Sequence, residues 1–171
     1  SDIETLDDQG VTEISIYTQD HLGLFARTCA GLALAGISVQ DARIVTTKDG
    51  MTVNTFLIRS TNDTSLTEEK NRLKILTDTL RKTISEERNP KILMNEFKSI
   101  QIPSRKDSFL IEPRVLIDNL SSKSHTVIEI NSKDKIGLLH TLASELFLMG
   151  LHVSTARIST YGVRVVDVFY I

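Results

Sequence analysis

The chain has no tryptophan, one cysteine and three prolines among its 171 residues. A single cysteine excludes an internal disulfide and is typical of a protein from a reducing compartment. Because Cys29 lies among Leu24, Phe25 and Leu32, we expect it to be a small core residue rather than a nucleophile. No apolar run approaches the ~20 residues that a helix needs to span a bilayer, so no membrane-spanning helix is predicted. The acidic, polar N-terminus is unlike a signal peptide.

An excess of charge of one sign is also missing. The chain has 20 basic and 22 acidic residues, and aromatic residues make up 5% of it. Nucleic-acid-binding proteins concentrate positive charge, and RNA-binding ferredoxin-like modules expose aromatic residues on their central strands, so nucleic-acid binding is disfavoured. No cluster of His and Cys has metal-ligand spacing, and no nucleophile–base pair stands out. We therefore expect neither a metal site nor catalytic residues.

What the sequence does contain is a long internal repeat. Displacing the chain by 114 positions aligns residues 20–46 with residues 134–160, and eleven of the 27 aligned pairs are identical. In the first copy, the identical residues are Asp20, Gly23, Leu24, Leu32, Leu34, Gly36, Val39, Ala42, Arg43, Ile44 and Thr46. The match continues on both sides of this segment, so the repeat is a whole supersecondary unit.

Each copy has the pattern of a strand, a helix and two more strands. Isoleucines alternate with polar residues in the first strand, and apolar residues three and four positions apart then predict one buried face of a helix. The helix ends at Gly36 in the first copy and at Gly150 in the second, where a left-handed residue is favoured. β-Branched residues predict second strands at Val39–Thr47 and Val153–Tyr161. A Lys-Asp-Gly hairpin signal then predicts a third strand at Met51–Arg59.

The first copy continues beyond this pattern. A polar helix is predicted from Leu66, and its buried stripe is formed by Leu73, Leu76, Leu80 and Ile84. Residues 86–113 contain all three prolines and form a long connection, after which Val115–Asn119 is predicted as a fourth strand. The order βαββαβ predicts an α+β fold of two ferredoxin-like units, each an antiparallel sheet with its helices on one face.

The chain is accordingly divided into three segments. We predict a polar N-terminal tail at residues 1–10, a first domain at residues 11–119 and a second domain at residues 120–171. The second copy stops at Ile171, inside its third strand. We therefore expect an incomplete second unit, βαββ only, and a chain that is part of a longer protein.

The turn Asp-x-x-Gly-Leu occurs in both copies, at Asp20–Leu24 and at Asp134–Leu138. It joins a strand to a helix, so free N–H groups and the positive end of the helix dipole attract a carboxylate there. Glycine lets a ligand approach the backbone closely, and the aspartate accepts an ammonium group. Together these features favour a free amino acid as the ligand. The alternative is that the aspartates only cap the helices and the glycines only permit the turn.

These residues resemble the ACT domain, a small βαββαβ module that binds amino acids and regulates enzymes. The phrases DARIVTTKDGMTVNTF, PRVLIDNLSSKSHTVIEI and STARISTYGVRVVDVFY are similar to the tandem C-terminal ACT domains of the bacterial bifunctional uridylyltransferase/uridylyl-removing enzymes. The resemblance covers nearly everything from Val11 to Ile171. It implies a multifunctional cytoplasmic parent enzyme, in which nucleotidyltransferase and hydrolase domains attach UMP to the PII signal protein and remove it.

Several further expectations follow from the resemblance. The ACT pair would sense glutamine, and the parent enzyme would need Mg²⁺, whereas this chain would have no cofactor of its own. The Gly-Ser signature of the nucleotidyltransferase and the His-Asp motif of the hydrolase are both absent here. The expected partners are therefore the amino acid, the PII protein, the catalytic domains of the parent chain and a second copy that pairs through the sheets.

The resemblance also implies which residues hold the amino acid. They belong to the turn and to the start of the second strand, which in ACT pairs often lies across the interface from a neighbour's ligand. These residues are Asp20, His21, Gly23, Leu24, Ser38, Val39, Asp134, Lys135, Gly137, Leu138, His152 and Val153. Arg43 and Arg157 pair either with a ligand carboxylate or with the turn aspartates. Asn54 and Asp167 align on the third strand and face either the ligand or a neighbouring strand.

Two questions stay open at the level of sequence. The turn contacts only the α-amino-acid part of a ligand, so it fixes neither the ligand's side chain nor the number of copies that bind. The alternative function is an ACT regulator of another amino-acid-linked enzyme, or a stand-alone amino-acid-binding protein.

Overall fold

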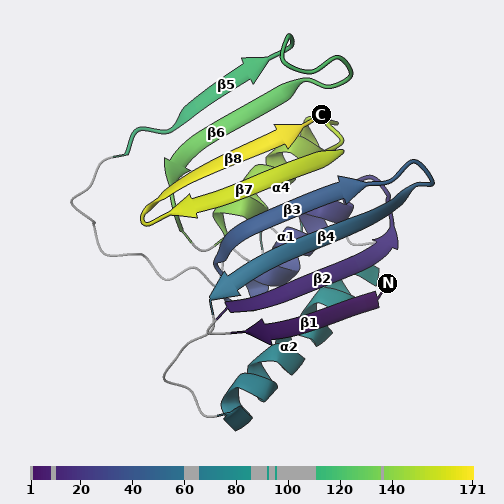
Figure 1. Ribbon diagram of the computed structural model, residues 1–171, viewed down its shortest axis with the longest axis vertical. Helices are drawn as coiled ribbons and strands as arrows, with labels where there is room; N and C mark the ends of the chain where they lie inside the picture. The colour runs from purple at the N-terminus through teal and green to yellow at the C-terminus, as the bar shows by residue number, and fades with distance from the viewer. Residues whose placement is uncertain are drawn as a thin grey trace.

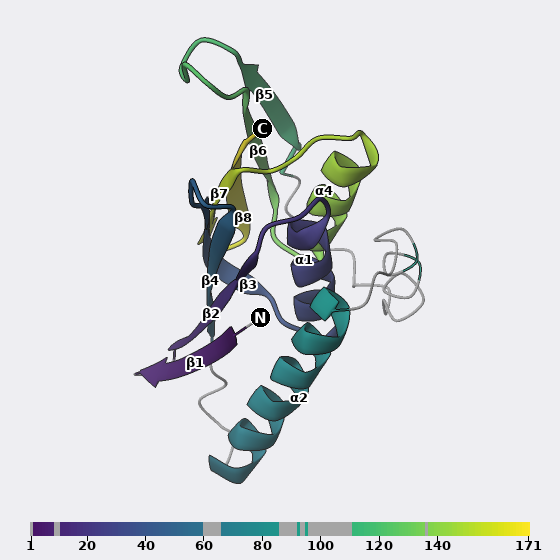
Figure 2. The ribbon, with the colours of Figure 1, turned by 90° about the vertical axis from the view of Figure 1, so that its right-hand side faces the viewer.

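The structure is a computed structural model that describes residues 2–8, 11–59, 66–85, 92, 95, 111–135 and 137–171. Its strands form one eight-stranded antiparallel sheet, and its helices cover one face of that sheet (Figure 1, Figure 2). In chain order, the elements are β1 (Asp2–Asp8), β2 (Val11–Gln19), α1 (Leu24–Leu34), β3 (Val39–Thr46), β4 (Met51–Arg59), α2 (Leu66–Ser85), β5 (Arg114–Asp118), β6 (Val127–Lys133), α4 (Leu138–Leu148), β7 (Thr155–Tyr161) and β8 (Arg164–Tyr170). The predicted α+β class and the helix-covered antiparallel sheet are confirmed.

The sheet consists of two similar halves that lie edge to edge. Its strand order is β1-β2-β4-β3-β7-β8-β6-β5, so β3 of the first half pairs with β7 of the second. From its outer edge inward, each half runs through an outer strand and then the first, third and second strands of the repeat. This is the ferredoxin-like order. In Figure 1 the purple and blue strands form one half, and the green and yellow strands form the other.

The outer strands differ from the prediction. The strand predicted at Val115–Asn119 exists as β5, but it pairs with β6 of the second half rather than with β2. The place beside β2 belongs to β1, which lies in the segment predicted to be a polar tail. Each half therefore has its outer strand before the βαββ pattern. The predicted order βαββαβ is present along the chain, but its last strand, β5, lies in the second half.

The local turn explains why β5 pairs with its neighbour in sequence. The backbone N–H groups of Leu120 and Ser121 donate to a carboxylate oxygen of Asp118, at 2.6 and 3.0 Å. Thr126 donates its hydroxyl to the side-chain oxygen of Asn119 at 2.7 Å, which closes the same loop. A loop stabilised in this way returns the chain as a hairpin, and short connections usually join adjacent strands.

The junction of the two halves has approximate twofold symmetry. Arg43 of β3 lies opposite Arg157 of β7, its counterpart in the repeat. The flanking pairs are Ala42 with Ile158 and Ile44 with Ala156. Since each flanking pair is the repeat image of the other, the local axis passes between the two arginines. The two halves thus meet as equivalent partners on one continuous sheet.

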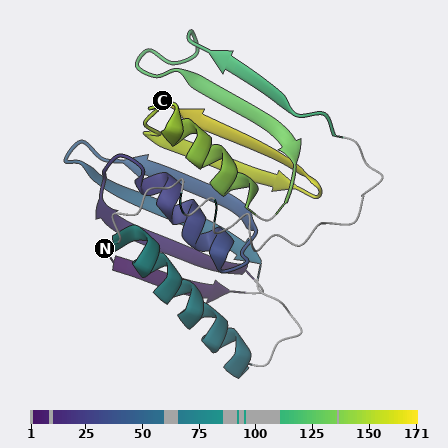
Figure 3. The same ribbon diagram turned by 180° about the vertical axis from the view of Figure 1, so that it is seen from behind.

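The helices α4, α1 and α2 lie side by side on the covered face (Figure 3). The central helix α1 packs against both neighbours. Its contact with α2 is close, because a Cβ on Gly31 would lie 2.5 Å from the hydroxyl of Thr83. The predicted buried stripe of α2 is confirmed at Leu76, Leu80 and Ile84, which are all buried. This packing fixes the start of α1, where the first turn lies.

Other sequence predictions concern single positions or segments. Cys29 is 2% exposed and is a core residue as predicted, and Gly36 and Gly150 have the predicted left-handed backbone. No helix in the described ranges is long and apolar enough to cross a membrane. The long connection predicted at residues 86–113 lies outside the described residues, apart from residues 92, 95 and 111–113.

Candidate functional site

The two repeated turns have the same backbone geometry. Gly23 and Gly137 are the N-cap residues of α1 and α4, with φ of 84° and 78°. Before them, the backbone N–H of Asp20 donates to the carbonyl of Gly50, and that of Asp134 donates to the carbonyl of Val163, at 2.8 and 2.9 Å. A positive φ is readily adopted only by glycine, so both glycines are needed for the turn itself.

Neither turn aspartate caps its helix. No side chain donates or accepts a capping hydrogen bond at the start of α1 or α4. Asp20 instead accepts a hydrogen bond from the hydroxyl of Thr46 at 3.1 Å and lies 3.2 Å from Nε2 of His152. Asp134 accepts a hydrogen bond from the hydroxyl of Ser38 at 3.3 Å. Because Ser38 and His152 correspond in the repeat, each aspartate reaches the equivalent residue of the opposite half.

These contacts define two pockets between the halves. The first pocket is lined by Asp20, His21, Gly23 and Leu24 of the first turn, together with His152 and Val153 of the second repeat. The second pocket is lined by Asp134, Lys135, Gly137 and Leu138 of the second turn, together with Ser38 and Val39 of the first repeat. All twelve residues singled out from the sequence therefore lie in two hollows related by the repeat.

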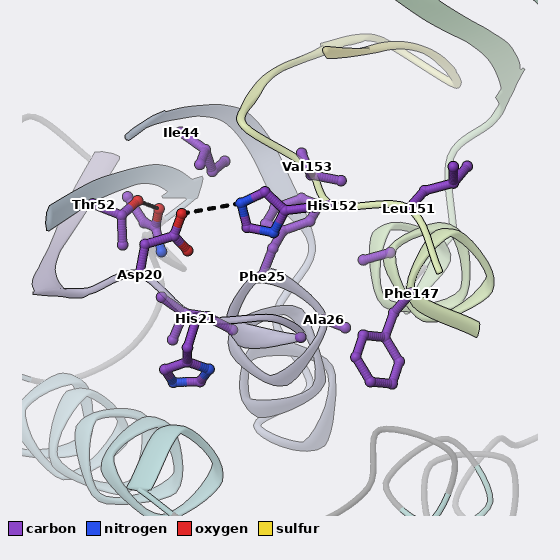
Figure 4. A pocket seen from close by; sticks show the side chains of 14 residues that line it. Asp20, His21, Phe25, Ala26, Ile44, Thr52, Phe147, Leu151, His152 and Val153 are labelled. Atoms are coloured by element: carbon purple, nitrogen blue, oxygen red, sulfur yellow. Dashed lines mark hydrogen bonds and ion pairs between the residues drawn. The ribbon is translucent and has the colours of Figure 1, made fainter. Parts of the chain in front are cut away.

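The first pocket is closed by side chains from both halves. Figure 4 shows Asp20 and His152 pointing toward each other across it, with Phe147 of α4 on the side of the second half and His21 turned away from the pair. The first pocket has a cavity volume of about 20 Å³, and so does the second. That enclosed volume is enough for a water molecule, and the rest of each hollow is open to solvent. An amino acid that enters the enclosed part would have to push the lining side chains apart.

The first turn also makes a close contact with α4. A Cβ on Gly23 would lie 2.8 Å from Cε2 of Phe147, so the ring edge of α4 rests directly against the glycine. The repeat counterpart of Phe147 is Ala33, which lines the second pocket. Gly23 is therefore required both by its backbone conformation and by the packing of α4.

The pockets also differ in their third-strand residues and their charge. Asn54 lines the first pocket and Asp167 the second, and both side chains are 1% exposed. Burial raises the pKa of Asp167 to about 7, and the nearby charge of Asp134 adds to this increase. Burial also raises the pKa of Asp134, against the effect of the hydrogen bond from Ser38. The second pocket therefore contains two interacting carboxyl groups, whereas the first pairs a carboxyl with an amide.

Two further buried groups line the second pocket. Burial lowers the pKa of His140 to about 4, so its imidazole is neutral at pH 7, and it lies 3.1 Å from the hydroxyl of Ser144. Burial raises the pKa of the Cys29 thiol well above its ordinary value, and the charge of Asp167 contributes in the same direction. The thiol is therefore protonated at pH 7, as expected for a core cysteine.

Some functional assignments from sequence do not match the geometry. Arg43 and Arg157 are exposed and line neither pocket, since they alternate along their strands with residues buried under the helices. Phe147 was missed because nothing in the sequence shows that α4 packs against the first turn. The departure from the repeat, phenylalanine in one copy and alanine in the other, is the signal that marks this position. Within the described ranges, no group of three or more His, Cys, Asp or Glu residues is placed to hold a metal ion.

The chain is similar to curated proteins named bifunctional uridylyltransferase/uridylyl-removing enzyme. The relative from Gluconobacter oxydans is 38% identical over 164 residues, which are 96% of this chain and 17% of that protein. The relative from Azospirillum brasilense is 39% identical over 173 residues, which cover 99% of this chain and 18% of that protein. The resemblance stated from the sequence is thereby confirmed. The chain spans less than a fifth of the length of these curated relatives.

No protein-family model matches the chain. Among solved structures, the aspartate kinase from Synechocystis is similar with a TM-score of 0.47 and 17% sequence identity, over 94% of this chain and 24% of that one.

Proposed function

We propose that the chain is the amino-acid-sensing regulatory pair of a bifunctional uridylyltransferase/uridylyl-removing enzyme, with glutamine as its ligand. The observation that carries the proposal is the meeting of each repeated turn with the second-strand start of the other repeat, which places the twelve candidate residues in two equivalent pockets. Similarity to relatives of that name along nearly the whole chain supports the choice of parent enzyme.

The turns offer complementary groups for both charges of an amino acid. The turn aspartate accepts the ammonium group, and the first turn of the helix attracts the carboxylate through its N–H groups and dipole. One of these groups is already used, because the N–H of Leu24 donates to the carbonyl of His21 at 3.0 Å. The equivalent bond joins Leu138 to Lys135. The carboxylate would therefore be bound by the next N–H groups along each helix.

Binding would act on the junction between the halves. The ligand's ammonium group competes with His152 for Asp20 in the first pocket, and with Ser38 for Asp134 in the second. Since the enclosed part of each pocket has a volume of only about 20 Å³, an amino acid that enters it also has to displace the walls that the opposite half provides. The ligand thus binds an open arrangement better than the closed one. A difference of ~1–3 kcal/mol in affinity, or about 5–150-fold, is typical of allosteric coupling.

The remaining parts of the proposal concern the longer protein. Catalysis would reside in nucleotidyltransferase and hydrolase domains that act on the PII signal protein in the bacterial cytoplasm. The Mg²⁺ that such a nucleotidyltransferase uses would be bound there. A second copy of the chain would pair through the sheets.

The proposal is tested by calorimetry and thermal unfolding of the 171-residue chain with L-glutamine, with L-glutamate as the matched control. Ligand at ten times its Kd should stabilise the fold by about 1.4 kcal/mol for each pocket that it occupies. Asp20→Asn and Asp134→Asn should each remove one binding event, and the double variant should remove both. Absence of heat and of any thermal shift at millimolar glutamine would count against the proposal.

A panel of the twenty amino acids separates this function from the alternative. Binding of a different amino acid, with no response to glutamine, would favour an ACT regulator of another enzyme or a stand-alone binding protein.

A further inference from the structure

The two pockets differ in the polar group at their third strand. Asn54 on β4 and Asp167 on β8 are repeat counterparts, and each is 1% exposed. Within the described part of the chain, Nδ2 of Asn54 and Oδ1 of Asp167 have no hydrogen-bond partner. A buried polar atom without a partner costs free energy, so each pocket contains a group that is completed when a ligand binds. The two groups, however, are chemically opposite, because one donates and the other accepts.

A second substitution reinforces this difference. The hydroxyl of Thr52 donates to Oδ1 of Asn54 at 2.9 Å, which holds the amide and leaves its nitrogen as the open group. The counterpart of Thr52 is Val165, which is 3% exposed and has no hydroxyl to offer Asp167. The second pocket has therefore lost a donor and gained a carboxyl group relative to the first.

The titratable surroundings of Asp167 come from several elements. Asp134 faces it from the turn before α4, and Cys29 faces it from α1. His140 of α4 and Lys135 of the turn line the same pocket. Directly opposite on the neighbouring strands are only apolar residues, Ile130 on β6 and Ile158 on β7. Of the groups on this list, Cys29 and His140 are uncharged at pH 7, and Lys135 is exposed.

We propose that the two pockets bind the ligand in different ways. The second pocket binds the ligand's ammonium group between Asp134 and Asp167, and this carboxyl pair releases a proton. The first pocket binds the ligand through Asp20 and Asn54 without proton release. The inference rests on the proposed function. One carboxyl group loses its proton to the solvent, and the positive charge of the ligand's ammonium group then balances the carboxylate that forms.

The pH dependence follows from this exchange. Because the pKa of Asp167 is about 7, the carboxyl is mostly protonated at pH 6 and mostly ionised at pH 8. Binding to the second pocket should therefore be about tenfold weaker at pH 6 than at pH 8, with about half a proton released per ligand at pH 7. Binding to the first pocket should change much less over this range.

The experiment exchanges the two groups and counts protons. Calorimetry with L-glutamine in phosphate and in Tris, whose ionisation enthalpies differ, gives the number of protons released. Asp20→Asn silences the first pocket and Asp134→Asn silences the second, so that each pocket is measured alone. In the Asp20→Asn chain, Asp167→Asn should abolish proton release. In the Asp134→Asn chain, Asn54→Asp combined with Thr52→Val should introduce it, because Thr52 would otherwise stabilise the ionised carboxyl group. Val165→Thr should reduce proton release, because the new hydroxyl stabilises the ionised carboxyl group.

The outcomes separate the inference from the function on which it rests. Equal proton counts in the two pockets, or proton release that survives Asp167→Asn, would overturn the inference while the function stands. Absence of glutamine binding in every variant and in the parent chain would overturn both. Cooperative urea unfolding checks that each variant is folded. Should Asn54→Asp fail this check, the loss of proton release in Asp167→Asn and Asp167→Ser still decides the matter.

Discussion

Gly23→Ala tests the packing of α4 against the first turn. The alanine would have to adopt φ near 84°, which costs an L-residue about 1–2 kcal/mol. Its Cβ would also lie 2.8 Å from Cε2 and 3.1 Å from Cδ2 of Phe147, so the ring has to shift by several tenths of an ångström. Overpacking of this kind costs about 1–3 kcal/mol, and the half-buried position of the ring favours the lower end. We therefore expect a total loss of about 2–4 kcal/mol.

Gly36→Ala is the matched control. Gly36 has φ of 71°, and a Cβ there would meet no atom within 4 Å, so this substitution carries the backbone cost alone. Urea unfolding at pH 7 and 25 °C should show Gly23→Ala to be less stable than Gly36→Ala by about 1–2 kcal/mol, with the m-value unchanged. In the background of Phe147→Ala, this difference should disappear. Equal losses for the two glycines in the parent chain would refute the contact between the first turn and the second half.

Three other measurements test the charges and the burial of single side chains. The pKa of Asp167 is raised to about 7, so its contribution to stability is full below about pH 4 and is lost as the pH rises to 7. The pKa of His140 is lowered to about 4, so its contribution to stability is full above about pH 6.5 and is lost as the pH falls to 4. In Asp167→Asn only the contribution of His140 remains, so urea unfolding should show stability that rises between pH 4.5 and pH 6.5, by about 1.4 kcal/mol for each unit by which the pKa of His140 is lowered. At pH 8 this variant should be more stable than the parent chain, and a pH profile parallel to the parent's would contradict the prediction. Arg43→Glu replaces the repulsion between Arg43 and Arg157 by an attraction and should stabilise the chain by about 0.2–1 kcal/mol at low salt. The gain should shrink at high salt, because salt screens the charge of Arg157. Cys29 should react with a thiol reagent only as fast as the fold opens, and rapid labelling in the absence of urea would show that its burial is wrong.

The repeat unit was predictable because local patterns specify it. The third strand at Met51–Arg59 was predicted with the bounds it has, since a hairpin signal precedes it and β-branched residues fill it. The helix stripes follow from residues three and four positions apart, and the left-handed backbone at Gly36 and Gly150 follows from the absence of a side chain. Each of these signals lies within a few residues of the structure it predicts.

Strand pairing was less predictable because alternation does not name a partner. The residues of β5 suit a strand in either half, and the deciding contact is the loop in which Asp118 accepts hydrogen bonds from Leu120 and Ser121. The short connection from β1 to β2 likewise indicates that these two strands pair, but the acidic residues of β1 leave no hydrophobic pattern from which the strand can be recognised. An outer strand with little burial leaves only a weak hydrophobic signal.

The residues that line the two pockets were predictable, but their contacts were not. The turns were visible as repeated motifs, whereas the contact between Asp20 and His152 depends on the pairing of β3 with β7. That pairing places Arg43 opposite Arg157, an arrangement that charge alone disfavours. The difference between Asn54 and Asp167 was visible in the alignment of the repeats, but only the structure shows that both side chains are buried in the pockets.

The exchange of walls between the two repeats has a consequence for how the duplicated segments can change. A substitution at the start of β3 alters the hollow that contains the second turn, and a substitution near His152 alters the hollow that contains the first. Neither segment can therefore change without altering the wall of the pocket that contains the other repeat's turn. Loss of either repeat would open both pockets at once, so the two copies depend on each other and neither can replace the other.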